Sequence, residues 1–234
     1  MIRRFLIAAL IAGLAVPAFA QEMPAPPQVA PLQTTTPQPT PPQPTTVKVV
    51  MTTELGPITI ALETQRAPVT AGYILRHVDE KRLDGGAFYR AYKVVPDGSI
   101  GLVQGGIQDG RKLLPPVAHE PTSTTGLTHD EGAISLARAA PGTAQAQFFI
   151  IVGNLKSLDA NPAGTDDNQG FAVFGRVTDG MDVVRKILNV PISATRGAGP
   201  MKGQMIDAPV KILTVTRLVP LPRKPMARRP ARKR

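Results

Sequence analysis

Residues 88–106 read FYRAYKVVPDGSIGLVQGG, and they consist of two β-rich runs, 88–95 and 102–105, with a polar loop between them. The stretch is largely apolar, so we expect it to be buried, yet it contains Arg90 and Gln104, whose planar heads form hydrogen bonds. It has no nucleophile beside a base, no pair of acids and no set of metal ligands. Any chemistry at this stretch must therefore work without a group that exchanges protons at neutral pH.

Runs of this kind recur from residue 47 to residue 219 and indicate about eight short strands. The first two flank Gly56, and Ile58, Ile60 and Leu62 alternate in the second of them, which predicts a hairpin. The remaining predicted strands are 88–95, 102–105, 133–137, 147–152, 171–177 and 210–219. Closing such a set into a barrel removes exposed sheet edges. We therefore predict a mainly β fold, a closed eight-stranded antiparallel β-barrel.

Two α-helices are predicted, one near each end of this region. The first lies in APVTAGYILRHVDEKRL (67–83), where Pro68 suits the first helical turn. Its apolar side repeats with the helical period at Val69, Tyr73, Ile74, His77 and Val78. The second helix is predicted for residues 180–188. We expect these two helices to cap the two openings of the barrel.

The first twenty residues have the pattern of a secretory signal peptide. Two arginines precede an apolar run (5–16) that is too short to cross a hydrocarbon core of about 30 Å, and the segment ends in Ala-Phe-Ala. We expect cleavage after Ala20. The chain has no cysteine, which excludes disulfides, thiolate catalysis and cysteine-ligated zinc. An exported protein without cysteines is expected in the periplasm of a Gram-negative bacterium.

Two further segments differ in composition from the domain at 47–219. Residues 21–46 hold nine prolines, five glutamines and one charge, which is typical of a disordered linker with extended polyproline character. Residues 220–234 hold seven of the 27 basic residues, and two more lie in the signal segment, so 27 − 9 = 18 remain against 17 acids. The domain is thus nearly neutral, and we expect the basic block to form a disordered tail. We expect at most weak contact between this tail and anionic envelope components, and no binding to nucleic acid.

Three other kinds of site are not supported. The motif DGSIG (97–101) lacks the first glycine of a nucleophile elbow and is interpreted as a turn. His77, His119 and His129 are not at metal-ligand spacing and are interpreted as surface or loop residues. The segment QGGIQDG (104–110) lacks the lysine of a phosphate-binding loop. No cofactor or metal is therefore expected.

The segment QFFIIV (147–152) predicts a second apolar surface. Neighbouring residues of a strand point to opposite faces, so Phe148 and Phe149 cannot both enter one core, and Gln147 shares the side of Phe149. By the same alternation, Phe88 and Arg90 should share one face. Together these strands predict an apolar groove on the outside of the barrel with hydrogen-bonding groups at its floor. The alternative is core packing of the phenylalanines and an ordinary salt bridge for Arg90.

Several motifs resemble one family. FYR, VQGG, GAISLAR, QFFI, LD and FAVFGRV occur in the order, and nearly the spacing, of the cyclophilin-type peptidyl-prolyl cis-trans isomerases. TTELGPITIALE and APVTAGYI at the front also fit, so the resemblance covers residues 47–219. It implies an eight-stranded barrel capped by two helices, with a proline-binding groove on its outer face.

The resemblance also implies roles for individual residues. The catalytic positions of the family fall on Arg90 and Gln104. The positions that bind substrate, in the proline pocket and along the strand edge that holds the substrate backbone, fall on Leu102, Ala137, Arg138, Ala139, Gln147, Phe149, Leu158 and Phe171.

This chain departs from well-studied members of the family at several of these positions. Gly101 stands where a pocket phenylalanine is usual, so we expect one pocket wall to be missing and Phe171 to supply replacement area. Arg138 replaces an asparagine, and Ser157 replaces a tryptophan, which suggests weak binding of cyclosporin. An insertion, ANPAGTDDNQG (160–170), follows the motif LD.

The resemblance and the residue types together support one chemistry, acceleration of rotation about X–Pro bonds in exported proteins that are folding. That rotation has a barrier of about 20 kcal/mol and needs no covalent step. A guanidinium can donate to the prolyl nitrogen in the twisted state, and it stays protonated throughout the working pH range. A low-turnover module that binds proline segments, or a chaperone of the cell envelope, is the alternative. A third possibility is a passenger barrel that the linker and tail localise to the envelope. We expect a monomer.

Overall fold

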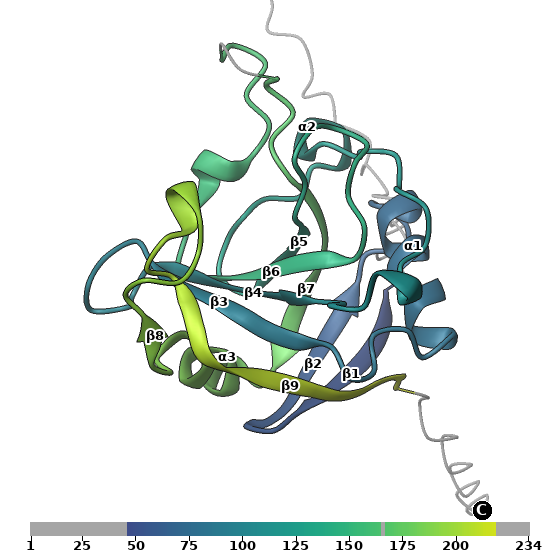
Figure 1. Ribbon diagram of the computed structural model, residues 1–234. Coiled ribbons are helices and arrows are strands. Elements are labelled where there is room, and N and C mark those ends of the chain that lie inside the picture. Colours follow the sequence, from purple (N-terminus) through teal and green to yellow (C-terminus); the bar gives the residue numbers. More distant parts are fainter. Residues whose placement is uncertain (1–45, 165–166, 219–234) are drawn as a thin grey trace, which may run out of the picture. The chain divides into compact units, whose positions relative to one another are not determined.

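The computed structural model describes residues 46–164 and 167–218. The predicted signal peptide, nearly all of the predicted linker and the basic tail lie outside these residues. Figure 1 shows the described strands wrapped into a barrel, with α1 on one side and α3 beneath it.

The barrel is closed by antiparallel pairing throughout. In chain order the strands are β1 (Val47–Thr53), β2 (Gly56–Leu62), β3 (Ala87–Lys93), β4 (Gly101–Gly106), β5 (Ala133–Leu136), β6 (Gln147–Val152), β7 (Ala172–Asp179), β8 (Ile192–Ser193) and β9 (Met205–Arg217). Around the ring the order is β1-β2-β7-β5-β6-β4-β3-β9, and β9 pairs back with β1. The predicted closed eight-stranded barrel is therefore confirmed. The ninth strand, β8, has two residues and pairs only with the start of β9, so no sequence pattern indicated it.

The first hairpin forms where alternation predicted it. Ile58, Ile60 and Leu62 are buried, and Gly56 pairs with Thr53 at the turn. Gly56 has φ 131°, and a Cβ there would lie 3.0 Å from a methyl group of Val183. Glycine fits this turn because it has no side chain and tolerates positive φ.

Aromatic and branched side chains fill the barrel. Phe148 points inward and meets Phe88 edge to face, with ring centroids 5.7 Å apart and planes at 87°. Phe174 and Ile134 are buried beside them. Each such side chain contributes roughly 1.5–3 kcal/mol on burial, so this core is a main source of stability in a chain that has no cysteine.

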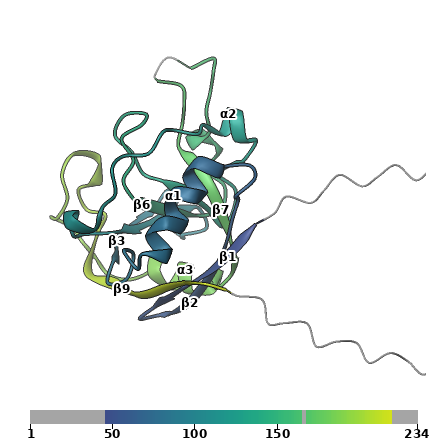
Figure 2. The ribbon, with the colours of Figure 1, turned by 90° about the vertical axis from the view of Figure 1, so that its right-hand side faces the viewer.

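The two predicted helices are present, as α1 (Pro68–Asp79) and α3 (Met181–Leu188), and Figure 2 shows α1 lying obliquely across one side of the barrel. A third helix, α2 (Thr122–Thr125), is a single turn that ends at Gly126, and one turn is too short for a periodic signal. The described chain thus has three α-helices rather than the two expected.

The apolar stripe of α1 also differs from the prediction. The buried positions of the helix are Thr70, Ala71, Ile74, Leu75, His77 and Val78. The buried stripe keeps the helical period but begins at Thr70, one residue later than predicted. Val69 therefore lies outside the stripe and is 47% exposed.

Candidate functional site

One groove on the outside of the barrel has a volume of about 730 Å³ and lies against the outward faces of β3, β4 and β6. All ten residues predicted for the site line it: Arg90, Leu102, Gln104, Ala137, Arg138, Ala139, Gln147, Phe149, Leu158 and Phe171. The last part of its wall comes from two single-turn 3₁₀ helices, η2 (Lys156–Leu158) and η3 (Gly199–Met201). Residues from distant parts of the sequence therefore meet at one surface.

The prediction placed Arg90 on the correct face of its strand but paired it there with the wrong aromatic residue. A register shift between Phe88 and Arg90 interrupts the pairing of β3 with both β4 and β9. This bulge breaks the alternation, so Phe88 is 0% exposed inside the barrel while Arg90 faces the groove. The aromatic group that shares the groove face with Arg90 is Tyr92, two residues on, whose ring centroid lies 5.6 Å from the guanidinium carbon.

Two glutamines hold the guanidinium of Arg90 from opposite sides. Nη1 donates to Oε1 of Gln104 at 2.8 Å, while Nε and Nη2 both donate to Oε1 of Gln204 at 2.8 and 2.6 Å. Gln204 is itself fixed, because its Nε2 donates to the carbonyl of Pro200 at 2.7 Å and its own carbonyl accepts from the N–H of Ala91 at 3.0 Å.

These bonds leave a defined donor set on Arg90. A guanidinium has five N–H groups, and three are engaged here, which leaves one on each terminal nitrogen without a partner among the described residues. Burial lowers the pKa of Arg90, and the neighbouring Tyr89 and Tyr92 oppose that shift. The group nevertheless stays charged at neutral pH, because the ordinary pKa of a guanidinium lies far above that range.

The apolar part of the groove centres on Phe149. Its ring is 4% exposed and meets Phe171 edge to face at 5.3 Å. Leu158 lies next to Phe171, since the N–H of Phe171 donates to the carbonyl of Leu158 at 3.0 Å. Leu102, which pairs with Tyr92, completes the wall on β4.

Gly101 does not leave a gap in this wall, contrary to expectation. Leu102 and Gln104 line the groove, so alternation turns position 101 inward. A Cβ on Gly101 would lie 2.5 Å from the carbonyl oxygen of Tyr92 and 3.3 Å from the side chain of Leu188. Glycine at this position therefore lets β3 and α3 approach β4 closely.

Arg138 ties the inserted segment to the groove. Its guanidinium donates to the carbonyl of Gly170 and to both carboxylate oxygens of Asp167, at 2.7 and 2.8 Å, and lies 5.3 Å from the ring centroid of Phe171. Hydrogen bonding to Arg138 lowers the pKa of Asp167 to about 2. Because the Arg138 side chain is only 6% exposed and its charge is paired, it contributes packing to the groove rather than a free cation.

Gln147 is held in place at both ends of its amide. Tyr89 donates its hydroxyl to Oε1 of Gln147 at 2.9 Å, and Nε2 of Gln147 donates to the carbonyl of Ile107.

Sequence reasoning missed several groove residues. They are Tyr92, Leu113, Thr143, Gln145 and Met201, which line the groove, and Gln204, which holds Arg90. Strand alternation from Arg90 could have found Tyr92. Met201 ends η3, Gln204 immediately precedes β9, and the others lie on loops, where no periodic pattern marks them.

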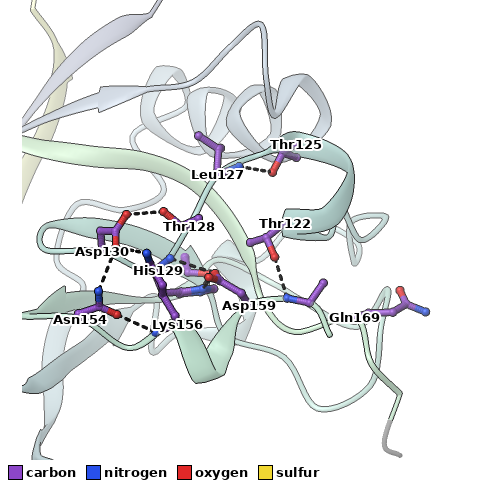
Figure 3. A network of polar contacts seen from close by, with 12 residues as sticks. Thr122, Thr125, Leu127, Thr128, His129, Asp130, Asn154, Lys156, Asp159 and Gln169 are labelled. Atoms are coloured by element: carbon purple, nitrogen blue, oxygen red, sulfur yellow. Dashed lines mark hydrogen bonds and ion pairs between the residues drawn. The ribbon is translucent and has the colours of Figure 1, made fainter. Parts of the chain in front are cut away.

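The three histidines were predicted to be surface or loop residues, but two of them are buried, His77 in α1 and His129 in the loop that follows α2. His77 and His129 are both 0% exposed, and only His119 is partly exposed. His77 donates from Nδ1 to the carbonyl of Tyr73 at 2.9 Å and accepts at Nε2 from the N–H of Leu114 at 3.4 Å. His129 lies behind the groove, and Figure 3 shows its hydrogen bonds to Asp159.

Residues 46–164 and 167–218 contain no cluster of three or more His, Cys, Asp or Glu residues that could hold a metal ion. Within the same residues, every helix is too short or too polar to cross a membrane.

Comparison with known proteins gives one consistent result. The sequence model of the family "Cyclophilin type peptidyl-prolyl cis-trans isomerase/CLD" matches residues 48–217. A peptidyl-prolyl cis-trans isomerase of Acinetobacter baylyi is 36% identical over 171 residues, which cover 71% of this chain and 83% of that protein. Peptidyl-prolyl cis-trans isomerase A of Dickeya dadantii is 35% identical over 157 residues, 65% of this chain and 75% of that protein.

The fold is also similar to that of solved structures. The crystal structure of a cyclophilin type peptidyl-prolyl cis-trans isomerase from Cryptosporidium parvum superposes with a TM-score of 0.56 at 17% sequence identity. The match covers 75% of this chain and 99% of that chain.

Proposed function

The chain belongs to the family of cyclophilin-type peptidyl-prolyl cis-trans isomerases and is an enzyme of that class, and we propose that Arg90 is the group that lowers the barrier to rotation. The observation that carries this proposal is the guanidinium fixed between Gln104 and Gln204 with one N–H free on each terminal nitrogen.

The mechanism follows from the change in the prolyl nitrogen during rotation. In the planar amide its lone pair is delocalised into the carbonyl, which gives the C–N bond its partial double-bond character. As the bond twists, the lone pair localises and can accept a hydrogen bond. A donor from Arg90 then forms a bond that exists only in the twisted state, so it stabilises the transition state and not the planar substrate.

The apolar wall holds the proline ring against this donor. Phe149, Leu158 and Phe171 supply the surface for the ring, and Leu102 bounds it on the side of β4. Excluding water from this pocket strengthens the field of the guanidinium, because the interaction of charges rises as the local dielectric constant falls. No residue in this scheme has to gain or lose a proton.

The decisive experiment replaces Arg90 by alanine and measures proline-limited refolding of a test protein. The variant should lose most of the catalysed rate while its circular dichroism spectrum and melting temperature stay close to those of the parent. Full activity in a correctly folded Arg90→Ala protein would exclude this role.

We propose further that the enzyme is exported to the periplasm, acts there as a monomer on proteins that are folding, and contacts anionic envelope components weakly through its tail. The signal-like segment 1–20, the absence of cysteine and the basic block at 220–234 support this. Cells that express the full chain and cells that express a chain lacking residues 220–234 are fractionated. The comparison tests both the cellular location of the protein and the role of the tail. Recovery of the full chain in the cytoplasmic fraction would contradict export.

The alternative of a low-turnover binding module loses its main support. Its best support was two departures from the family pattern, Gly101 in place of a pocket phenylalanine and Arg138 in place of an asparagine. Gly101 faces away from the groove, and Arg138 is paired with Asp167.

A further inference from the structure

His129 is the centre of a buried polar network immediately behind the groove. Its Nδ1 lies 2.6 Å from Oδ1 of Asp159, its Nε2 lies 3.1 Å from Oγ of Ser135, and its backbone N–H donates to the same Asp159 oxygen at 3.0 Å. In Figure 3 His129 and Asp159 face each other beneath the segment that contains α2, and the hydroxyl of Thr122, at the start of α2, accepts from the N–H of Ala160 at 2.7 Å.

This network does not form a hydrolytic site. A serine, a histidine and an aspartate stand in the order that activates a nucleophile, but Ser135 and His129 are both 0% exposed. No substrate can reach the hydroxyl of Ser135, so another role has to explain a histidine at this place.

The ring of His129 packs directly on the pocket. It stacks on Phe149 with centroids 5.9 Å apart and planes only 14° from parallel. Its backbone carbonyl accepts from the N–H of Leu155 at 2.9 Å, and Asp159 directly follows η2, which carries Leu158. One residue therefore contacts Phe149 through its ring and holds both ends of the turn that presents Leu158.

The hydrogen bonds of His129 fit a neutral ring that is held in one orientation. Burial lowers its pKa, while the hydrogen bond to Asp159 and the negative charges of Asp159 and Asp130 act in the opposite direction, and Lys156 lies 3.7 Å from Asp130. A neutral imidazole donates from one nitrogen and accepts at the other. Because a carboxylate only accepts, the proton belongs on Nδ1, and Nε2 accepts from Ser135. Both ring nitrogens are then satisfied in one orientation.

We propose that His129 is a positioning residue of the proline pocket, which holds the ring of Phe149 and the turn of Leu158 in a fixed mutual arrangement. The inference rests on the proposed role of Phe149 and Leu158 in gripping the proline ring. The arginine site is separate, since none of the bonds to Arg90 comes from His129 or Asp159. Loss of His129 should therefore weaken substrate binding and leave the rotation step nearly unchanged.

The test compares the same substitution at two buried histidines. His129→Gln and His77→Gln each remove a fully buried imidazole, but only the first touches Phe149. KM and kcat are measured by NMR line shape with a short peptide that contains one Ala–Pro bond. For His129→Gln we expect KM to rise roughly two- to tenfold, the range for loss of one aromatic contact, with kcat within a factor of two. His77→Gln should lower the melting temperature and leave KM unchanged.

Two substitutions at Asp159 test the same proposal if His129→Gln folds poorly. Asp159→Asn retains an oxygen that accepts from Nδ1 and should keep the parental KM, whereas Asp159→Ala removes it and should raise KM as His129→Gln does. A ¹⁵N spectrum of the folded enzyme at pH 7 should show His129 neutral and protonated on Nδ1.

The proposal fails if His129→Gln and Asp159→Ala both keep the parental KM, or if His129 is protonated on Nε2 alone. Either outcome would leave the role of Arg90 untouched, because Arg90→Ala would still be inactive. An active Arg90→Ala enzyme would instead contradict the proposed mechanism whatever His129 does.

Discussion

Replacing Gln204 by alanine should slow the isomerase more than replacing Gln104 by alanine. Oε1 of Gln204 accepts two N–H groups of Arg90, at 2.8 and 2.6 Å, whereas Gln104 accepts one at 2.8 Å. A hydrogen bond to a charged group contributes about 1.5–3 kcal/mol, but Arg90 is only half-buried, so water recovers part of each lost bond. We therefore expect Gln204→Ala to lose about 1–2 kcal/mol of transition-state stabilisation, which is a five- to thirtyfold fall in kcat/KM.

The assay is kcat/KM for an Ala–Pro peptide, with melting temperature and circular dichroism as checks on folding. For Gln104→Ala, with one bond lost, the expected fall is about two- to tenfold. Gln204→Glu separates position from charge, because it keeps an oxygen that accepts both N–H groups of Arg90 but loses the amide donor to Pro200 and places an anion opposite the guanidinium. It should hold Arg90 firmly and still be slower than the parent, since the carboxylate offsets the field that the twisted nitrogen experiences.

Non-additivity shows whether the effect of Gln204 passes through Arg90. In an Arg90→Ala background, Gln204→Ala should cause no further loss, because the group that it positions is gone. The reasoning is refuted if folded Gln204→Ala has parental activity, or if it slows the Arg90→Ala enzyme by the same factor as the parent.

Three further outcomes are expected. Glu120→Ala should lower the free energy of unfolding in urea by about 1–2 kcal/mol, because Glu120 accepts from the N–H groups of residues 69 and 70 at 3.1 and 2.6 Å and so caps a helix whose own N-cap side chain is an alanine. Unchanged stability would mean that water replaces this cap. Gly101→Ala should destabilise the fold by about 1–3 kcal/mol and should not tighten peptide binding, since its methyl group would meet the carbonyl of Tyr92; improved binding would return Gly101 to the pocket wall. Burial lowers the pKa values of His77 and His129. Below pH 6.5, the ordinary pKa of histidine, the unfolded chain therefore binds more protons than the folded chain. The free energy of unfolding should therefore fall as the pH drops from about 7 towards 5, and urea titrations that show no such slope would contradict it.

Strand alternation predicted much of the site because the period of a strand is fixed by its geometry. In β6 it separates Phe148, inside the barrel, from Gln147 and Phe149 at the groove. The same rule failed for Phe88 and Arg90, where a bulge adds one residue to one strand. Bulges depend on how two or three strands fit together, and nothing in the sequence of one strand marks them.

Burial of polar residues was the other feature that the sequence could not supply. His129 lies in a loop whose residues, LTHDEG, are mostly polar, so the sequence suggested an exposed side chain. It is buried because Asp159 and Ser135, which lie 30 and 6 residues away, satisfy its ring. A polar side chain can enter a core when its partners enter with it, and those partners become neighbours only after the barrel has formed.

The rigidity of Arg90 depends on closure of the barrel as well as on its own strand. Gln204 immediately precedes β9, and it lies 114 residues from Arg90 in the sequence. Near its beginning β9 pairs Met205 with Arg90, and at its end it pairs Arg217 with Val49 of β1. The strand that completes the ring is thus the one that brings the second glutamine to the guanidinium. An isolated β3–β4 hairpin would contain Arg90 and Gln104 but would hold the arginine by one bond instead of three, which leaves it free to rotate away from a twisting peptide bond. The motifs in residues 88–106 therefore supply the donor, and the closed barrel supplies the fixed orientation that makes the donor effective.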